Sequence, residues 1–296
     1  MKLYAPLYYK KFKCIADRCT HSCCVGWEID IDDCTLEKYS TLSGSYGECI
    51  RKSIDNSDTP CFRLADGERC PHLNNNGLCN IITNFGEDYL CEICLEHPRF
   101  YNDTPMGKEV GVGIACEEAC RIVLNSNEYN SFYIVEELEG EADEYDFDPL
   151  PYRTRIFEIL GLDLPYKERL SMIYKEFSVS TSIFCDNEWL SCIGSLEYLD
   201  SAHCQLFSCF SANNHCDFEK ELERALAYFV YRHTTQATSE DDFYASLGFC
   251  LFCERLLCSL ATKTDIYLAA RIISEELEYS CDNTEAIKEQ FMKKIL

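Results

Sequence analysis

The spacing of apolar and polar residues differs between the two halves of the chain. From about Tyr152 onward, apolar residues recur every three or four positions, the period of a helix with one buried face. Ser239 is predicted to cap the helix that contains Phe243 and Leu257. The predicted helices lie within residues 152–176, 186–210, 219–233, 239–260, 266–277 and 284–295.

The first 120 residues instead contain short apolar runs separated by Gly, Asn and Asp. Residues 26–32 alternate between apolar and polar, which predicts a short half-buried strand. Asn74–Gly77 predicts a turn, and Glu117–Leu124 predicts a helix. Such a region buries little core, so we expect a bound metal to supply part of its folding free energy.

An acidic stretch separates these regions, since eight of the thirteen residues in 136–148 are Asp or Glu and none is basic. The predicted fold is therefore mainly α. It comprises a cysteine-rich, irregular metal-binding domain with short strands over 1–135, an acidic linker over 136–150 and an all-α domain over 151–296.

The net charge of −24, from 51 acidic and 27 basic residues, argues against a nucleic-acid partner. It suits a basic, lysine-bearing protein surface, or serves solubility alone. No segment approaches the roughly 20 apolar residues of a membrane span. The first residues include Pro6 and no apolar signal-peptide core, so no membrane partner and a cytoplasmic location are expected.

Cysteine content changes this picture most, with 22 cysteines, thirteen of them in residues 1–120 and none in 121–184. In a long chain without a visible secretion signal, this richness indicates metal binding or redox chemistry rather than disulfides. Four groups lie close to turn residues: Cys14, Cys19 and Cys23-Cys24; Cys70 and Cys79; Cys91 and Cys94; Cys116 and Cys120.

Thiolates are soft ligands that select zinc, copper(I) or iron–sulfur clusters. A structural zinc takes four ligands, so more than four candidates imply two sites, or one cluster with spare cysteines. Cys34, Cys49 and Cys61 lack partners at ligand spacing and are interpreted as ordinary cysteines. The cysteines of the apolar stretch 247–260, which include Cys250 and Cys253, are predicted to pack in a core.

Together these motifs resemble the flagellin lysine N-methyltransferase family. The resemblance covers roughly residues 4–125. The matching stretches are Phe12–Asp32, Cys70–Leu73, Leu78–Ile81 with Gly86-Glu87, Cys94 with Pro98-Arg99, and Cys116–Ala119.

The resemblance implies an iron–sulfur cluster, of the 4Fe-4S type with zinc as the alternative. It also implies methyl transfer from S-adenosylmethionine to lysine ε-amines of flagellin or another lysine-bearing protein. Cys91 is a second choice as a ligand. The alternative function is a non-catalytic zinc or iron–sulfur protein for partner binding or redox sensing. The cluster ligands that the resemblance implies are Cys14, Cys19, Cys23, Cys24, Cys70, Cys79, Cys94 and Cys116.

Several neighbouring residues are further candidates. Arg99 is predicted to bind the cofactor, through a hydrogen bond to cluster sulfur or to a cofactor carboxylate, with a surface ion pair as the alternative. His97 is a ligand, a donor to a ligand, or neither. Glu117 and Glu118 are candidate bases for the lysine proton, or simply a solvated helix start. No glycine-rich nucleotide loop is recognisable, so no catalytic residue is assigned.

Overall fold

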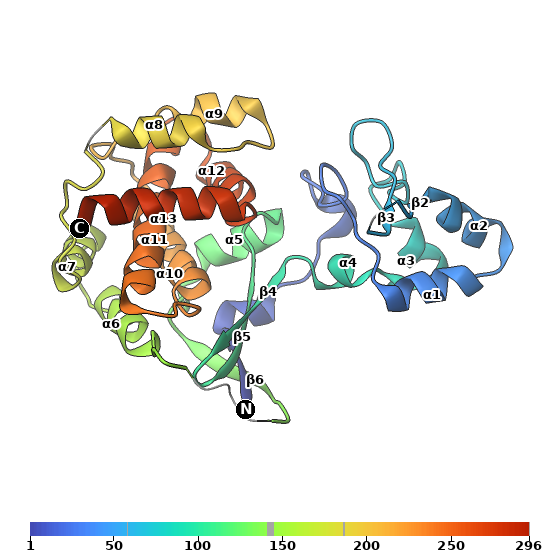
Figure 1. Ribbon diagram of the computed structural model, residues 1–296, viewed down its shortest axis with the longest axis horizontal. Helices are drawn as coiled ribbons and strands as arrows, with labels where there is room; N and C mark the ends of the chain where they lie inside the picture. Colours follow the sequence, from blue (N-terminus) through green and yellow to red (C-terminus); the bar gives the residue numbers. More distant parts are fainter. Residues whose placement is uncertain (58, 141–144, 186, 296) are drawn as a thin grey trace. The chain divides into compact units, whose positions relative to one another are not determined.

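The computed structural model describes residues 1–57, 59–140, 145–185 and 187–295, and its contacts divide the chain into two compact units (Figure 1). The cysteine-rich unit consists of residues 13–100 and 116–118. The helical unit consists of residues 1–12, residues 101–115 and the chain from Ala119 onward.

Most of the helical unit is α-helix, as the apolar spacing predicted. α11 lies at its centre, and α10, α12 and α13 pack against it (Figure 1). Its helices are α5 Glu117–Asn125 (whose first two residues belong to the cysteine-rich unit), α6 Leu150–Leu160, α7 Tyr166–Glu176, α8 Glu188–Ser195, α9 Ser201–Phe207, α10 Glu219–His233, α11 Glu240–Leu260, α12 Ile266–Ile273, the π-helix η4 Ser274–Glu278 and α13 Cys281–Ile295.

The central helix α11 begins where the sequence predicted, because the Ser239 hydroxyl accepts a hydrogen bond from the backbone N–H of Asp242. By length and composition alone α11 is apolar enough to cross a membrane, and 83% of its most apolar window is buried inside the protein. The expectation that no segment approaches a membrane span was therefore wrong as a statement about composition. The burial of α11 is that of a core helix.

Helices α11 and α13 approach each other closely at Gly248. A Cβ atom at this position would overlap the ring of Phe291, which is fully buried. The glycine is therefore required by packing, since a dense core cannot absorb another carbon without moving its neighbours.

A four-stranded sheet, which the sequence pattern did not predict, completes the helical unit. Its strands lie in the order β4-β5-β1-β6, with β1 parallel to β5 and antiparallel to β6. Gly107, at φ +132°, lies so close to the Lys2 backbone that a side chain would clash. The strands are β1 Lys2–Pro6, β4 Arg99–Thr104 (whose first two residues belong to the cysteine-rich unit), β5 Gly107–Val112 and β6 Phe132–Glu137, and the 3-10 helix η1 Leu7–Lys11 follows β1.

The predicted domain ranges stay predictions, but the elements show where the chain differs from them. Residues 1–12 and 101–115 belong with the helices rather than with the cysteines. Glu136 and Glu137, predicted to lie in the linker, end strand β6 opposite Leu3 and Lys2. Residues 141–144 of that linker lie outside the described residues. The described residues from 151 onward contain helices and turns, as expected.

The cysteine-rich unit is built of short elements. The alternation in 26–32 is confirmed in burial, because Ile29 and Ile31 are buried, but the segment forms only an isolated bridge, Asp30 to Cys61, instead of a strand. Helices α1 and α2 were not predicted. The elements are η2 Ala16–Arg18, α1 Asp33–Thr41, α2 Gly44–Ser53, β2 Ile54–Asp55, β3 Cys61–Phe62, α3 Asn80–Phe85, η3 Glu87–Tyr89 and α4 Glu92–Glu96.

Candidate metal centre

Five cysteines share the small apolar core of the cysteine-rich unit, and we call them the inner group. Cys70 and Cys91 are buried in that core, and the other three pack against it. The core itself is formed by Ile29, Ile31, Tyr39, Ile50, Ile54, Phe62 and Ile81. The inner group is Cys24, Cys70, Cys79, Cys91 and Cys94.

Short backbone elements place the inner group. The N–H of Cys70 donates to the carbonyl of Cys24 at 2.8 Å, which joins two predicted motifs 46 residues apart. Cys79 and Cys91 each immediately precede a helix, α3 and α4 respectively. The carboxylate of Asp32 caps both α1, through the N–H of Thr35, and α4, through the N–H of Glu92 at 2.9 Å. One aspartate therefore ties the two helix starts together.

Thiols of the inner group interact with one another. The hydrogen bond with Cys94 lowers the pKa of Cys91, and the same bond together with burial raises the pKa of Cys94. Burial raises the pKa of Cys70 to about 12, with the charges of Cys24 and Cys79 adding to the shift. Metal binding replaces such thiol protons, and this exchange makes affinity pH-dependent.

Tyr39, which no sequence motif singles out, contacts this group. Its hydroxyl lies 3.6 Å from Cys91 Sγ and donates to the carbonyl of Tyr89 at 2.7 Å. The ring is fully buried. Cys91, a second choice by sequence, is thus among the best-enclosed thiols of the unit.

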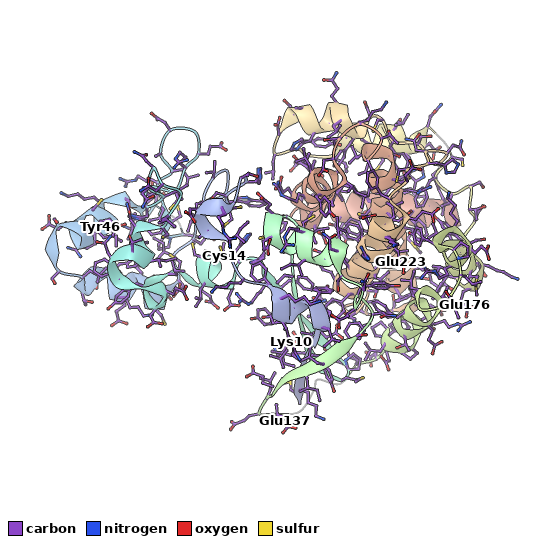
Figure 2. The ribbon with its side chains drawn as sticks, turned by 180° about the vertical axis from the view of Figure 1, so that it is seen from behind. Lys10, Cys14, Tyr46, Glu137, Glu176 and Glu223 are labelled. Atoms are coloured by element: carbon purple, nitrogen blue, oxygen red, sulfur yellow. The ribbon has the colours of Figure 1, made fainter. Side chains whose placement is uncertain are left out.

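The remaining four implied cysteines gather elsewhere in the unit, and we call them the outer group. Cys14 and Cys23 are exposed, and Cys19 and Cys116 are half-buried. The hydrogen bond with Cys24 raises the pKa of Cys23, and the charges of Cys116 and Cys14 raise it further. Figure 2 shows Cys14 well apart from Tyr46, which packs against the inner core. The outer group is Cys14, Cys19, Cys23 and Cys116.

Glu117, the residue after Cys116, binds the loop that contains Cys19. Its carboxylate accepts hydrogen bonds from the backbone N–H and hydroxyl of Thr20 at 2.8 and 2.7 Å and from the N–H of His21 at 3.0 Å. Cys19 Sγ lies 3.6 Å from the same oxygen. Burial raises the pKa of Glu117, but these hydrogen bonds outweigh it and hold the pKa below its usual value. A carboxylate with these partners is a clamp, so the prediction of Glu117 as a general base finds no support in its contacts.

An arginine that the sequence did not single out lies beside a thiol. The pKa of Cys24 falls to about 6, chiefly through the hydrogen bond from Cys23, with further lowering by the hydroxyl of Ser22 and the charge of Arg69.

Arg99 donates to the Leu95 carbonyl at 3.1 Å, at the end of helix α4. Its predicted role in cofactor binding stays a prediction.

Two histidines of the motifs differ in their contacts. His72 is buried with both ring nitrogens 3.0 Å from hydroxyls, those of Tyr46 and Ser53, so it anchors the core, and burial lowers its pKa to about 4. His97 has a buried Nε2 atom without a hydrogen-bond partner, and burial lowers its pKa. A neutral imidazole with a free nitrogen retains its capacity as a ligand.

The donor chemistry fits a soft metal, since the two groups together supply nine thiols from residues 14–116. Within the described part of the chain, no three His, Cys, Asp or Glu side chains are yet arranged as a finished ligand set. Thiols that hydrogen-bond to each other, as in Cys91 and Cys94, must rotate toward a metal to ligate it. The cysteines therefore fit a soft metal by the type of their donor atoms and by their grouping within one unit.

Four cysteines outside these groups have packing roles. Cys250, Cys253 and Cys258 are buried in α11, which confirms the predicted core packing. Cys120 is fully buried in the helical unit and its thiol donates to the Tyr267 carbonyl at 3.5 Å. The motif Cys116-x3-Cys120 therefore separates: Cys116 faces the outer group, and Cys120 belongs to the helical core.

Comparisons with known proteins give three related matches. The lysine-N-methylase of Salmonella typhimurium is 26% identical over 129 residues, 40% of this chain and 32% of that protein. The lysine-N-methylase of Salmonella choleraesuis gives the same values. The flagellar biosynthetic protein FliU of Salmonella muenchen is 25% identical over 127 residues, 40% of this chain and 75% of that protein.

These matches confirm the predicted resemblance to lysine-N-methylases, over a limited length. The matched stretch spans about a third of each lysine-N-methylase. No protein-family profile and no solved structure matches the chain.

Proposed function

We propose that this protein methylates lysine ε-amines of flagellin, or of another lysine-bearing protein, with S-adenosylmethionine as the methyl donor. The observation that supports this most directly is the similarity to two proteins named lysine-N-methylase and to a flagellar biosynthetic protein. Their names describe those proteins, and we extend the activity to this chain as a hypothesis.

The cysteines support an iron–sulfur cluster as part of this proposal. The inner group supplies five thiols in an apolar shell. Cys91, a second choice by sequence, is the most deeply buried of the five. A cluster bound there would supply a Lewis-acidic or redox-active iron. The hydrogen bonds and apolar contacts around the thiols, including that of Tyr39, would tune it.

The substrate side of the proposal rests on charge. A protein of net charge −24 attracts lysine-rich surfaces and raises their rate of encounter, in a salt-dependent way. The lysine must lose its proton before it attacks a methyl group. Since Glu117 accepts three short hydrogen bonds from Thr20 and His21, we do not assign the base to it.

The test uses the full chain, purified without oxygen and reconstituted with iron and sulfide. Incubation with S-adenosylmethionine and flagellin, followed by mass spectrometry of flagellin, is expected to show increments of one methylene unit. Cys70→Ser/Cys79→Ser should abolish them. Cys34→Ser/Cys49→Ser, in two exposed cysteines outside both groups, should not. Unmodified flagellin with an intact cluster would contradict the proposal for this substrate.

A second candidate is a non-catalytic metal protein that binds a partner or senses redox state. The observation in its favour is that the acidic residue beside the outer thiols serves as a structural clamp. Under this alternative, metal is bound and flagellin mass is unchanged, while flagellin or another basic partner still associates with the protein.

A further inference from the structure

We propose that the cysteine-rich unit forms two separate metal centres, an iron–sulfur cluster on the inner group and a mononuclear, zinc-type thiolate centre on the outer group. This inference rests on the proposed use of these cysteines as metal ligands, but not on methyl transfer. It decides between the two arrangements that ligand number alone leaves open.

The first argument is the placement of the thiols. All five inner cysteines belong to one apolar core, whereas Cys14 and Cys23 of the outer group are exposed. The outer loop is tied to Cys116 through its neighbour Glu117, which binds Thr20 and His21. The two groups meet at the adjacent residues Cys23 and Cys24, whose thiols hydrogen-bond to each other. The carbonyl of Cys24 then accepts from the N–H of Cys70, on the side of the inner group.

The second argument is stoichiometric. A structural zinc is closed by four ligands, and a 4Fe-4S cluster takes four cysteines. The outer group has four thiols and the inner group five, so each group suffices for one centre. A single centre of either kind would leave at least half of these neighbouring thiols without metal.

The third argument is the chemical setting. An apolar shell with few solvent contacts stabilises a cluster and sets its potential. The outer group instead sits on an exposed loop closed by a carboxylate, a setting in which a metal ion chiefly staples the backbone. The Glu117 clamp positions Cys19 and Cys116 for this purpose.

The experiment measures metals rather than activity. The anaerobically prepared full chain is reconstituted with iron, sulfide and zinc, and iron and zinc are quantified by elemental mass spectrometry beside the visible absorbance. Cys19→Ser/Cys116→Ser is expected to lose the zinc, about one ion per chain, and to keep iron and absorbance. Cys70→Ser/Cys79→Ser is expected to lose iron and absorbance and to keep zinc. Cys34→Ser/Cys49→Ser should keep all three.

Loss of both metals in either variant, or a single kind of centre in the unmodified chain, would overturn the inference. Since a variant can fail to fold, the unmodified iron-loaded chain is also titrated with cobalt(II). A tetrathiolate cobalt spectrum that develops without loss of iron supports two centres, and displacement of iron by cobalt refutes them. If two centres are found but flagellin is not methylated, this inference is supported and the proposed function is refuted for that substrate.

Discussion

Different interactions stabilise the interior of each of the two units. The helical unit buries large aromatic and aliphatic side chains around α11 and satisfies its buried charges with partners, such as Arg153 with Glu109 at 2.6 Å. The cysteine-rich unit has a core of seven buried non-cysteine apolar residues, and five cysteines lie in this core or pack against it. The difference teaches that side-chain packing suffices to specify the first unit, whereas the small core of the second would gain from the metal we propose, which would join its short elements.

Removal of metal should have the largest effect on the difference between the two units. Chelation of the reconstituted protein should unfold the cysteine-rich unit and leave the helical unit folded, because thiolate–metal bonds contribute on the order of 10 kcal/mol to small metal domains. Hydrogen exchange with mass spectrometry should then show lost protection in peptides from 13–100 and unchanged protection in 219–295. Equal loss in both units would contradict the distinction.

The next largest effect is expected at a buried ion pair of the helical unit. Arg169 donates two hydrogen bonds to the Glu223 carboxylate, at 2.8 and 2.6 Å, and both side chains are about nine-tenths buried. Glu223→Ala should destabilise this unit by about 3–5 kcal/mol, since it leaves a buried charge without its partner. Thermal unfolding followed by circular dichroism measures the change.

The same helix provides the control. Glu219 forms an exposed ion pair with Lys167, so Glu219→Ala should cost less than about 1 kcal/mol. Equal effects of the two substitutions would show that burial of the pair is unimportant.

Acid should affect the helical unit through Glu278. Burial raises the pKa of this carboxyl, but Arg232 and the hydrogen bond from His233 outweigh it and hold the pKa at about 2. A folded-state pKa below the ordinary value of 4.5 means that the stabilisation is complete above pH 4.5 and is lost as pH falls toward 2. The loss should amount to roughly 3 kcal/mol, measured by urea unfolding across that range. Glu278→Gln should flatten the dependence.

A smaller effect is expected in the inner group. Tyr39→Phe removes the hydroxyl that bonds to the Tyr89 carbonyl and touches Cys91. We expect about 1 kcal/mol of destabilisation confined to the cysteine-rich unit, together with a shifted visible spectrum of the bound cluster. An unchanged spectrum would separate this hydroxyl from the metal environment.

The smallest effect is expected for cysteines outside both groups. Cys49 is exposed on α2, and Cys49→Ser should change stability by less than about 0.5 kcal/mol and leave metal content unchanged. Loss of metal in this variant would mean that the two groups are defined incorrectly.

The sequence by itself determined the helices from residue 150 onward, because the apolar period of a helix is local and Ser239 caps α11 in the way its side chain allows. It also predicted the buried packing of Cys250 and Cys253, since an apolar helix face reveals its own burial. The alternation around Ile29 and Ile31 also correctly predicted that these two side chains are buried. The segment forms an isolated bridge instead of the predicted strand.

Only the tertiary structure decided which cysteines are neighbours. Cys19 approaches Glu117 across 98 residues, and Cys24 pairs with Cys70 across 46, while Cys116 and Cys120 separate within a single motif. The sheet depends likewise on β1 meeting β5 and β6, more than 100 residues away. Spacing along a chain determines what is close only over a few residues; beyond that, proximity is set by which surfaces bury each other, and no local pattern records that choice.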